Sequence, residues 1–297
     1  MFEGFEPVAL RGDGDLVLRG RAGGDKEAPP LLLLHGYPQT HVMWHGVAPE
    51  LAKTHRVICL DLPGYGASDA PPLSDNYAAY SKRAWAPHFV SAMASLGHET
   101  FAVAAHDRGA RAAYRLALDH SDRVTKLALL DIIPTVSMWD FANAQFAIST
   151  FHWGFLAQPA PFPEKMIEGN PDRFLDYCMA KWAADGFEFD AAAHDAYRAA
   201  FRNPSVIAAS CEDYRAGASI DVDADRASID AGQSFDGPSL LVWGSHNFGA
   251  DTDMICGLWK PFLPKVTGMA LDCGHFVAEE KPAETARALS RFFATSF

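Results

Sequence analysis

Short apolar runs that alternate with longer amphipathic stretches are the feature that most restricts the fold of this chain. Each run is four to six residues long, which suits a strand buried on both faces better than a helix. Strands of this kind occur in parallel sheets that helices cover on both sides. The sequence therefore predicts an α/β fold with a mostly parallel central sheet, whose strands are expected at 31–34, 56–60, 101–105, 126–131, 239–243 and 266–271.

The alternation of strands and helices is interrupted once. Helical periodicity is expected over residues 80–96, 108–120 and 282–293, whereas strand signals stop from residue 135 to residue 232 and an aromatic-rich, helix-like stretch replaces them. So long a stretch inside a compact domain favours an inserted unit with a role at a binding site. We interpret residues 135–232 as a helical cap, called the cap segment below, and residues 1–134 and 233–297 as the core domain.

Charge and composition exclude several classes of partner. Acidic residues outnumber basic residues by 37 to 25, which gives a net charge of −12 with neutral histidines. The basic residues form no run, so nucleic acid is not expected as a partner. The overall field would repel a small anionic substrate, so a site for one must supply its own positive charge.

Cysteine usage and the distribution of apolar residues indicate the compartment. The apolar runs are too short to span a bilayer, and the first residues do not form a basic and then apolar leader. The cysteines lack the spacing of a disulfide framework or a zinc site. We therefore expect a reduced, cytoplasmic protein without membrane contact; its five cysteines are Cys59, Cys178, Cys211, Cys256 and Cys273.

An aspartate, Asp107, follows the predicted strand 101–105 at a strand-to-helix turn. A sharp turn of this kind can carry a nucleophile, and it needs small residues two positions before and two positions after that nucleophile. Ala105 and Gly109 meet this need. Asp107 is therefore a candidate nucleophilic carboxylate, although an aspartate in this place is equally typical of a simple helix N-cap.

Two loops at the ends of other strands complete the pattern. His275 lies between Gly274 and Phe276 after the last predicted strand, which is the usual place of a general base in a chain with such a turn. The loop His35-Gly36-Tyr37-Pro38 follows the strand 31–34 and offers a backbone N–H to an oxyanion. We expect the two oxyanion N–H groups to belong to Tyr37 and Arg108.

The acid that orients His275 is expected at the end of one of two neighbouring strands. At the commoner location an asparagine, Asn247, stands where an aspartate is usual, and Asp251 and Asp253 lie further on as alternatives. We assign the role to Asp131, at the end of the strand 126–131. For Asp131 itself, a loop acid or helix cap is the alternative.

Arg108 and Arg111 lie three residues apart in the first turn of the helix that follows Asp107, and thus on one face of it. The positive end of a helix disfavours cations by roughly 0.3 to 1 kcal/mol each, so two arginines there suggest a bound anion. A two-armed clamp on a substrate carboxylate is one interpretation. Ion pairs with Asp107 or with other acids of the chain are the other.

Five short segments together make the chain resemble the fluoroacetate dehalogenases of the α/β-hydrolase superfamily, and the similarity extends over nearly the whole sequence. Those at 35–39, 61–68 and 274–276 are common to the superfamily, whereas the paired arginines of 106–111 and the His-Trp pair of 151–153 are specific. The resemblance implies an α/β-hydrolase fold with a helical cap, hydrolytic dehalogenation of a haloacetate, and a possible homodimer. It implies no cofactor and no metal, and the histidines show no ligand spacing.

In the reaction that the resemblance implies, Arg108 and Arg111 hold the substrate carboxylate while Asp107 attacks the carbon that bears the halogen. Water activated by His275, which Asp131 orients, then hydrolyses the ester formed on Asp107. From fluoroacetate this gives glycolate and fluoride.

The resemblance also implies that His152, Trp153 and Tyr214 donate hydrogen bonds to the departing halide. Fluoride is a poor leaving group and needs several directed donors. Tyr177 and Tyr197 also lie in the cap segment and compete with Tyr214 for this role. Trp182 is a further candidate for the wall of the pocket.

Alternative functions use the same residues differently. An epoxide hydrolase shares the aspartate nucleophile but needs cap tyrosines that protonate an epoxide oxygen, and it has no use for two arginines. A haloalkane dehalogenase usually has tryptophan where this chain has Arg108. A binding protein that has lost its chemistry is the remaining alternative, and it would usually lack the nucleophile, the base or the acid.

Overall fold

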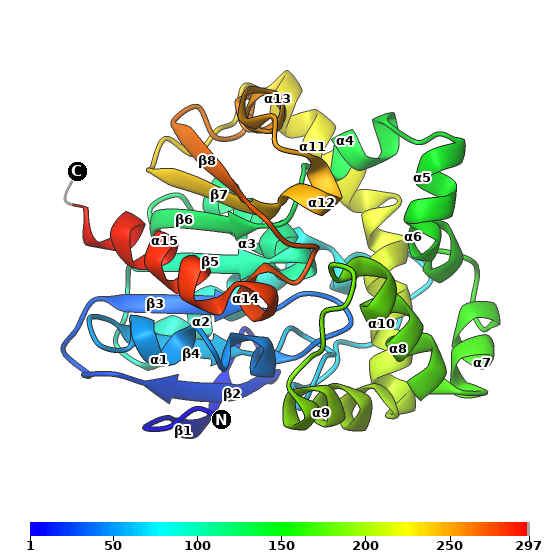
Figure 1. Cartoon of the computed structure of the whole chain (residues 1–297), viewed down its shortest axis with the longest axis horizontal. Coiled ribbons are helices and arrows are strands. Elements are labelled where there is room, and N and C mark those ends of the chain that lie inside the picture. The colour runs from blue at the N-terminus through cyan, green and yellow to red at the C-terminus, as the bar shows by residue number, and fades with distance from the viewer. Residues whose placement is uncertain (296–297) are drawn as a thin grey trace.

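The computed structural model, described here over residues 1–295, contains a sheet of eight strands in the order β1-β2-β4-β3-β5-β6-β7-β8 (Figure 1). Strands β3 to β8 are parallel to one another, and β2 is antiparallel to both of its neighbours, β1 and β4. The prediction of a mostly parallel sheet is therefore confirmed. The strands are β1 (Glu6–Arg11), β2 (Val17–Gly23), β3 (Pro30–Leu34), β4 (Arg56–Leu60), β5 (Phe101–His106), β6 (Val124–Leu130), β7 (Ser239–Gly244) and β8 (Val266–Leu271).

The sequence interpretation missed β1 and β2, and their position in the sheet explains why. They form an antiparallel hairpin at one edge. β1 is mostly exposed, and in β2 buried residues alternate with partly exposed ones, so neither strand has a continuous apolar run. The six predicted strands are the parallel strands of the sheet. Their ends differ from the predicted ends by at most two residues.

Helices cover both faces of the sheet (Figure 1). Helices α2 and α3 pack against each other on one face, and α1, α14 and α15 lie on the other. Helix α13 packs against β8 at the far edge. These elements are α1 (Ala48–Leu51), α2 (Lys82–Ser95), α3 (Asp107–Asp119), α12 (Ser245–Phe248), α13 (Thr252–Trp259), α14 (Val277–Glu280) and α15 (Pro282–Ala294), with short 3₁₀ turns at His41–Trp44 and Ala78–Tyr80.

Eight helices lie between β6 and β7, within the cap segment. Helices α5 to α10 gather beyond the carboxyl ends of the parallel strands, whereas α11 packs beside α4 and closer to the sheet (Figure 1). Ligands bind at this end of an open α/β sheet. The helices are α4 (Thr135–Asp140), α5 (Ala144–Ser149), α6 (Phe151–Leu156), α7 (Phe162–Glu168), α8 (Pro171–Trp182), α9 (Ala191–Phe201), α10 (Pro204–Gly217) and α11 (Ile220–Asp230).

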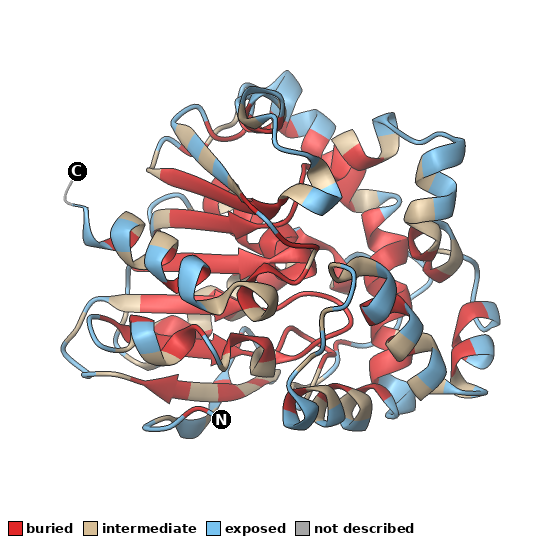
Figure 2. Ribbon diagram, in the orientation of Figure 1, coloured by how far each residue is buried: buried red, intermediate tan, exposed pale blue. Residues whose placement is uncertain are grey.

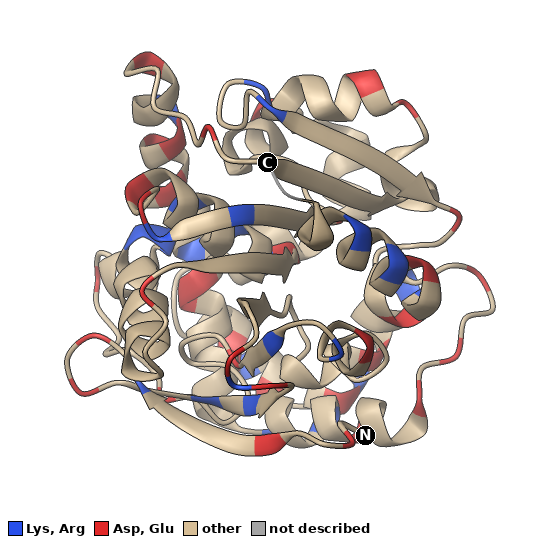
Figure 3. Cartoon of the chain, turned by 90° about the vertical axis from the view of Figure 1, so that its left-hand side faces the viewer, with Lys and Arg blue, Asp and Glu red and all other residues tan. Residues whose placement is uncertain are grey.

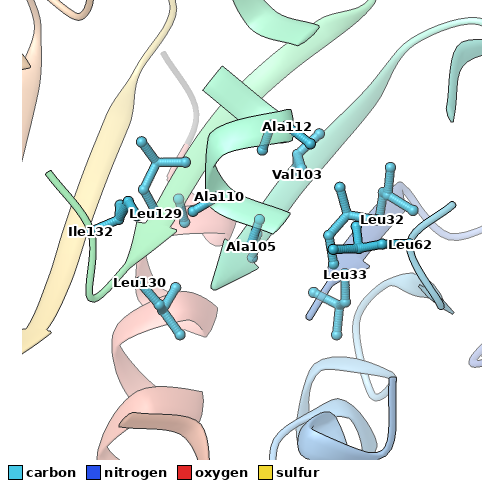
Figure 4. Close-up of a cluster of buried hydrophobic side chains, with 14 of the residues drawn as sticks. Leu32, Leu33, Leu62, Val103, Ala105, Ala110, Ala112, Leu129, Leu130 and Ile132 are labelled. Atoms are coloured by element: carbon cyan, nitrogen blue, oxygen red, sulfur yellow. The ribbon is translucent and has the colours of Figure 1, made fainter. Parts of the chain in front are cut away.

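The hydrophobic core lies on both faces of the parallel strands (Figure 2). Small residues of the central strand and of the helix that follows it, such as Val103, Ala110 and Ala112, let α3 approach the sheet closely (Figure 4). Leu32 and Leu129 flank them on the neighbouring strands. This packing fixes the first turn of α3, where Asp107 lies, against the centre of the sheet.

Surface chemistry agrees with an ordinary acidic globular protein. Lysine and arginine are interspersed with aspartate and glutamate along the ribbons (Figure 3). All five cysteines are buried and carry free thiols. In residues 1–295, no helix combines the length and the apolarity needed to cross a bilayer.

Candidate active site

Asp107 lies at a strained strand-to-helix turn at the end of β5. Its φ angle is +46°, in the left-handed region that side chains rarely adopt. A Cβ atom on Gly109 would lie 2.3 Å from the carbonyl oxygen of His35, and one on Gly36 would lie 2.5 Å from the Cβ of Asp107. Glycine is therefore required at both positions, and the need for a small residue two positions after Asp107 has a steric cause.

The turn directs the carboxylate of Asp107 into a buried cavity. Its Oδ1 atom accepts the backbone N–H of Tyr37 at 2.8 Å. Burial would raise the pKa of this carboxyl, but the positive charges of His275, Arg108 and Arg111 hold it below its usual value. Asp107 is thus an ionised carboxylate with one oxygen held by a backbone donor.

His275 is hydrogen-bonded to Asp131. The distance from Nδ1 of His275 to Oδ2 of Asp131 is 2.5 Å, and Asp131 also accepts the backbone N–H of Gly244 at 2.8 Å and the side-chain amide of Asn247 at 2.6 Å. Burial opposes the charge on the imidazole, but Asp131 outweighs it and raises the pKa of His275. With Nδ1 turned to Asp131, Nε2 is the nitrogen that can take a proton from water.

The competing acids of the sequence analysis lie elsewhere. Asp251 caps helix α13, where it accepts the N–H of Met254 at 2.9 Å, and Asp253 is exposed in the first turn of that helix. Asn247, which occupies the commoner acid position, serves Asp131 as a donor. The acid and its amide support therefore come from neighbouring strands, β6 and β7.

The two arginines of α3 have different surroundings. Arg108 is fully buried and pairs with Asp213 of α10: its Nε lies 2.8 Å from Oδ2, and its Nη2 bonds Oδ1 and the carbonyl oxygen of the same residue. Only Nη1 of Arg108 has no hydrogen-bond partner within residues 1–295. Arg108 therefore forms an ion pair with another acid of the chain, which was one of the two interpretations of the sequence.

The partner of Arg108 belongs to a larger buried network. Asp213 also bonds the ammonium group of Lys82 and accepts the hydroxyl of Tyr65 at 2.7 Å, and Lys82 lies 3.1 Å from Asp221. Two cations face two carboxylates, so the charges of this network balance. Arg108 is held rigidly in its place.

Arg111 is buried and has no carboxylate partner among the described residues. Its Nη1 donates to the hydroxyl of Thr135 at 2.8 Å and to the carbonyl of Ile133 at 3.3 Å, and its Nε is left without a partner. Burial and the nearby charge of Arg108 lower the pKa of Arg111. A buried guanidinium without a counter-ion, beside a cavity, is a place where an anion would be stabilised.

His152, Trp153 and Tyr214 belong to the cap segment. They line the same cavity as Asp107 and Arg111. Burial lowers the pKa of His152 to about 3, so its ring is neutral and carries one N–H. The guanidinium of Arg111 lies 4.5 Å from the ring centre of Trp153, and that of Arg108 lies 4.2 Å from the ring centre of Tyr214. These aromatic side chains are therefore packed against the cations of the site.

The structure distinguishes the three tyrosines of the cap segment. Tyr177 is about half exposed, and Tyr197 donates its hydroxyl to Glu279 at 2.8 Å. Tyr214 is buried, lines the cavity and packs edge-on against His152 with 5.5 Å between ring centres. Tyr214 is thus the one of these three that shares a cavity with Asp107.

The cavity itself has a volume of about 700 Å³. Trp182 forms part of its wall and contacts the rings of His152 and His275, at 4.3 and 5.9 Å between ring centres. Met138 and Phe248 lie on the same wall. Within residues 1–295, no group of three or more His, Cys, Asp or Glu side chains could hold a metal ion.

Three contributions to the site were missed from the sequence. Asp213 has no flanking motif in the sequence. The one signal that could have pointed to it is that an arginine buried at position 108 needs an acidic partner. Asn247 was noticed only as a missing acid, although an amide can support an acid on the next strand. The hydroxyl of Tyr37, a residue chosen for its backbone N–H, is buried in the cavity wall without a partner among the described residues.

Comparisons with known proteins place the chain in one family. A family model described as alpha/beta hydrolase fold matches residues 29–282. The chain is 42% identical over 293 residues to a fluoroacetate dehalogenase of Burkholderia sp., covering 98% of this chain and 95% of that protein. It is 29% identical to a soluble epoxide hydrolase of Corynebacterium sp. (strain C12), covering 89% and 90%. A crystal structure described as an α/β hydrolase of Nostoc sp. PCC 7120 matches with 42% identity, full coverage of both chains and a TM-score of 0.95.

Proposed function

The chain belongs to the α/β-hydrolase family, and from that premise we propose that this hydrolase is a haloacetate dehalogenase, with fluoroacetate converted to glycolate and fluoride. The observation that carries the proposal is the buried, unpaired guanidinium of Arg111 in the same cavity as the carboxylate of Asp107. A neutral substrate would leave that charge uncompensated. A 2-haloacid supplies its counter-ion and places its carbon before the nucleophile.

In the first step, Asp107 displaces the halide. A carboxylate oxygen of Asp107 forms a bond to the carbon of the substrate, and the carbon–halogen bond breaks with its electron pair leaving on the halide. Arg111, which lines the cavity, holds the substrate carboxylate. Arg108 is not among the residues that line the cavity, and we propose that its charge assists from behind Arg111. Donors from His152, Trp153 and Tyr214 stabilise the charge that develops on the halide.

In the second step, His275 activates water. Nε2 of His275 takes a proton from water as the water oxygen bonds to the carboxyl carbon of the Asp107 ester, and Asp131 stabilises the imidazolium. Negative charge develops on Oδ1 of Asp107, the carbonyl oxygen of the ester. The N–H of Tyr37, which already donates to that oxygen, and the N–H of Arg108 stabilise this charge. The ester bond then breaks, glycolate leaves with the proton from His275, and the new carboxylic acid of Asp107 loses its proton to solvent, which restores the carboxylate.

A second candidate function is epoxide hydrolysis. The relative from Corynebacterium supports it, as do two phenol groups in the cavity wall, those of Tyr37 and Tyr214, which could protonate an epoxide oxygen. The unpaired charge of Arg111 has no task in that reaction. A binding protein without activity is disfavoured because Asp107, His275 and Asp131 are all present and ordered.

The test is halide release from fluoroacetate and chloroacetate, with a neutral haloalkane and styrene oxide in parallel. Release of fluoride that Asp107→Asn abolishes would support the proposal. Turnover of styrene oxide with no halide from either acid would support the epoxide hydrolase instead. Inactivity on all four compounds would favour the binding protein.

We also propose a cytoplasmic location and a homodimer. Exposed apolar side chains on the cap segment, Phe162, Met166 and Tyr177, adjoin partly buried phenylalanines and offer a surface for a second copy. Light scattering after size exclusion would give the mass, and a monomer at micromolar concentration would contradict the dimer.

A further inference from the structure

The carboxylate of Glu280, at the end of α14, accepts three backbone N–H groups. Its Oε2 accepts the N–H of Gly274 at 2.7 Å and that of Ala184 at 3.0 Å, and its Oε1 accepts the N–H of Phe276 at 2.8 Å. Hydrogen bonds to an ionised acceptor are stronger than neutral ones. Gly274 and Phe276 are the neighbours of His275, so one side chain holds the histidine loop on both sides of the base.

The third donor, Ala184, belongs to the connection that follows cap helix α8. Two residues earlier, at the end of α8, the carbonyl oxygen of Trp182 accepts the N–H of His275 at 2.8 Å. A Cβ atom on Gly274 would lie 2.5 Å from the backbone nitrogen of Ala184. The histidine loop and the connection 182–184 are therefore in direct backbone contact, and Glu280 bridges them.

The histidine loop depends on this bridge for its conformation. Residues 272–276 have no regular secondary structure, so sheet or helix bonds do not fix them. Asp131 holds the imidazole ring through Nδ1. The backbone that carries the ring is held by Glu280 at the two neighbouring N–H groups, by the carbonyl of Trp182 at the N–H of His275, and by Nε2 of His106, which lies 2.9 Å from the carbonyl oxygen of His275. Loss of the bridge would release the N–H groups on both sides of His275 while the bonds to Asp131, Trp182 and His106 remain, so we expect a small displacement of Nε2.

We propose that Glu280 is a positioning residue of the proposed dehalogenase, which sets the rate of ester hydrolysis by holding His275 and which takes no part in halide displacement. The inference rests on the proposed function, because it divides the two steps described above. Displacement needs Asp107, the arginines and the halide donors, and Glu280 bonds none of them. Hydrolysis needs Nε2 of His275 to meet a water molecule at the ester.

The charge of Glu280 also acts on the base. Groups near the His275 ring are Asp131, Asp107 and the neutral ring of His106, whose centre lies 4.5 Å away. Asp131 and Asp107 raise the pKa of His275 most, and Glu280 adds to them. Removing the charge of Glu280 therefore lowers that pKa, and the pH at which hydrolysis begins to fail on acidification moves down.

The test compares Glu280→Gln with Glu284→Gln, an exposed glutamate in the first turn of α15. Glutamine keeps the size of the side chain but presents N–H₂ to one of the three donors. Chloroacetate is the substrate, because chloride is a better leaving group than fluoride and a slowed hydrolysis should then limit turnover in the variant. We expect Glu280→Gln to slow hydrolysis on the order of 100-fold, as a misplacement of the base by about 1 Å would.

Kinetics separate this effect from general damage. When hydrolysis alone is slowed, kcat and KM fall by the same factor, kcat/KM stays within about twofold, and one chloride per site is released in a burst. Mass spectrometry of the quenched variant should find Asp107 carrying a carboxymethyl group. Glu284→Gln should match the wild-type protein in every measurement.

Further variants and a substrate-free measurement complete the test. Glu280→Asp keeps the charge and shortens the reach, so it should slow hydrolysis while the pKa of His275, followed by NMR, stays near wild type. The same NMR titration should give a lowered pKa in Glu280→Gln. Two results for Glu280→Gln would overturn the inference. One is an equal loss in kcat and in kcat/KM, and the other is unchanged turnover without a burst of chloride. Absence of halide release from the wild-type protein would instead refute the proposed function.

Discussion

Replacing Arg111 by methionine should stabilise the protein while it abolishes haloacetate turnover. Arg111 is buried without a carboxylate partner within the described residues, and its lowered pKa means that folding disfavours its charge. Methionine has a similar length and no charge. The same change at Arg108, which pairs with Asp213, should have the opposite effect on stability.

The magnitudes follow from the contacts. Arg111→Met loses a hydrogen bond to Thr135 and a longer one to Ile133, worth roughly 1.5 to 3 kcal/mol together, but removes a desolvated charge that costs several kcal/mol. The hydroxyl of Thr135 keeps its bond to Tyr114. We expect a net gain of about 1 to 2 kcal/mol in the free energy of unfolding. Arg108→Met breaks a buried pair and should lose about 3 kcal/mol, the low end of the usual range because Lys82 still faces Asp213.

Urea unfolding followed by circular dichroism measures both values, and thermal midpoints should move on the order of 2 °C for each kcal/mol. Acetate, a carboxylate without a leaving group, should raise the midpoint of the wild-type protein and leave that of Arg111→Met unchanged. Arg111→Lys keeps the charge but loses the planar fork, so turnover should still fall sharply. A loss of stability in Arg111→Met equal to that in Arg108→Met would refute the reasoning, because Arg111 would then be a structural cation.

Three further predictions concern single side chains. Asp131→Asn should stall hydrolysis of the ester, whereas Asp251→Asn should not, and mass spectrometry of the quenched enzyme distinguishes them. Burial raises the pKa of Glu279 to about 8, so between about pH 4.5 and 8 the folded state binds more protons than the unfolded state and stability falls as pH rises. Glu279→Gln should remove that loss. In urea unfolding, the free energy of unfolding of the variant should exceed that of the wild-type protein by a few kcal/mol at pH 8.5 and by almost nothing at pH 5. Tyr37→Phe removes a buried hydroxyl that has no partner among the described residues, and it keeps the backbone N–H. The free energy of unfolding should therefore rise by about 1 kcal/mol. A fall would show that the hydroxyl is hydrogen-bonded.

The parallel strands and their ends could be predicted from the sequence because each strand carries its own signal. Short apolar runs marked β3 to β8, although β8 is a partly exposed edge strand and not the buried strand that was expected, and loops at their carboxyl ends placed Asp107, Asp131 and His275 at one end of the sheet. The structure brings Asp131 and His275 into contact across 144 residues. That contact was predictable since both residues follow strands of one parallel sheet.

Contacts across the cap segment could not be predicted in this way. Asp213 pairs with Arg108 over 105 residues, and no periodicity says which acid of α10 turns toward the core. Glu280 looks like an ordinary surface glutamate in the sequence. Its proposed positioning role depends on three backbone groups whose positions only the folded chain fixes.

The position of the acid on β6 has a consequence for how this enzyme can diversify. Because Asp131 comes from β6, the loop after β7 does not have to supply an acid. Its Asn247 donates to Asp131, and its His246 bonds the histidine loop at Cys273 and Asp272. Residues 246–248 of that loop line the cavity. We therefore expect changes at Phe248 to alter which substrates enter while the base and its acid stay intact. An acid on β6 therefore leaves part of the loop after β7 open to change without replacement of the proposed catalytic residues.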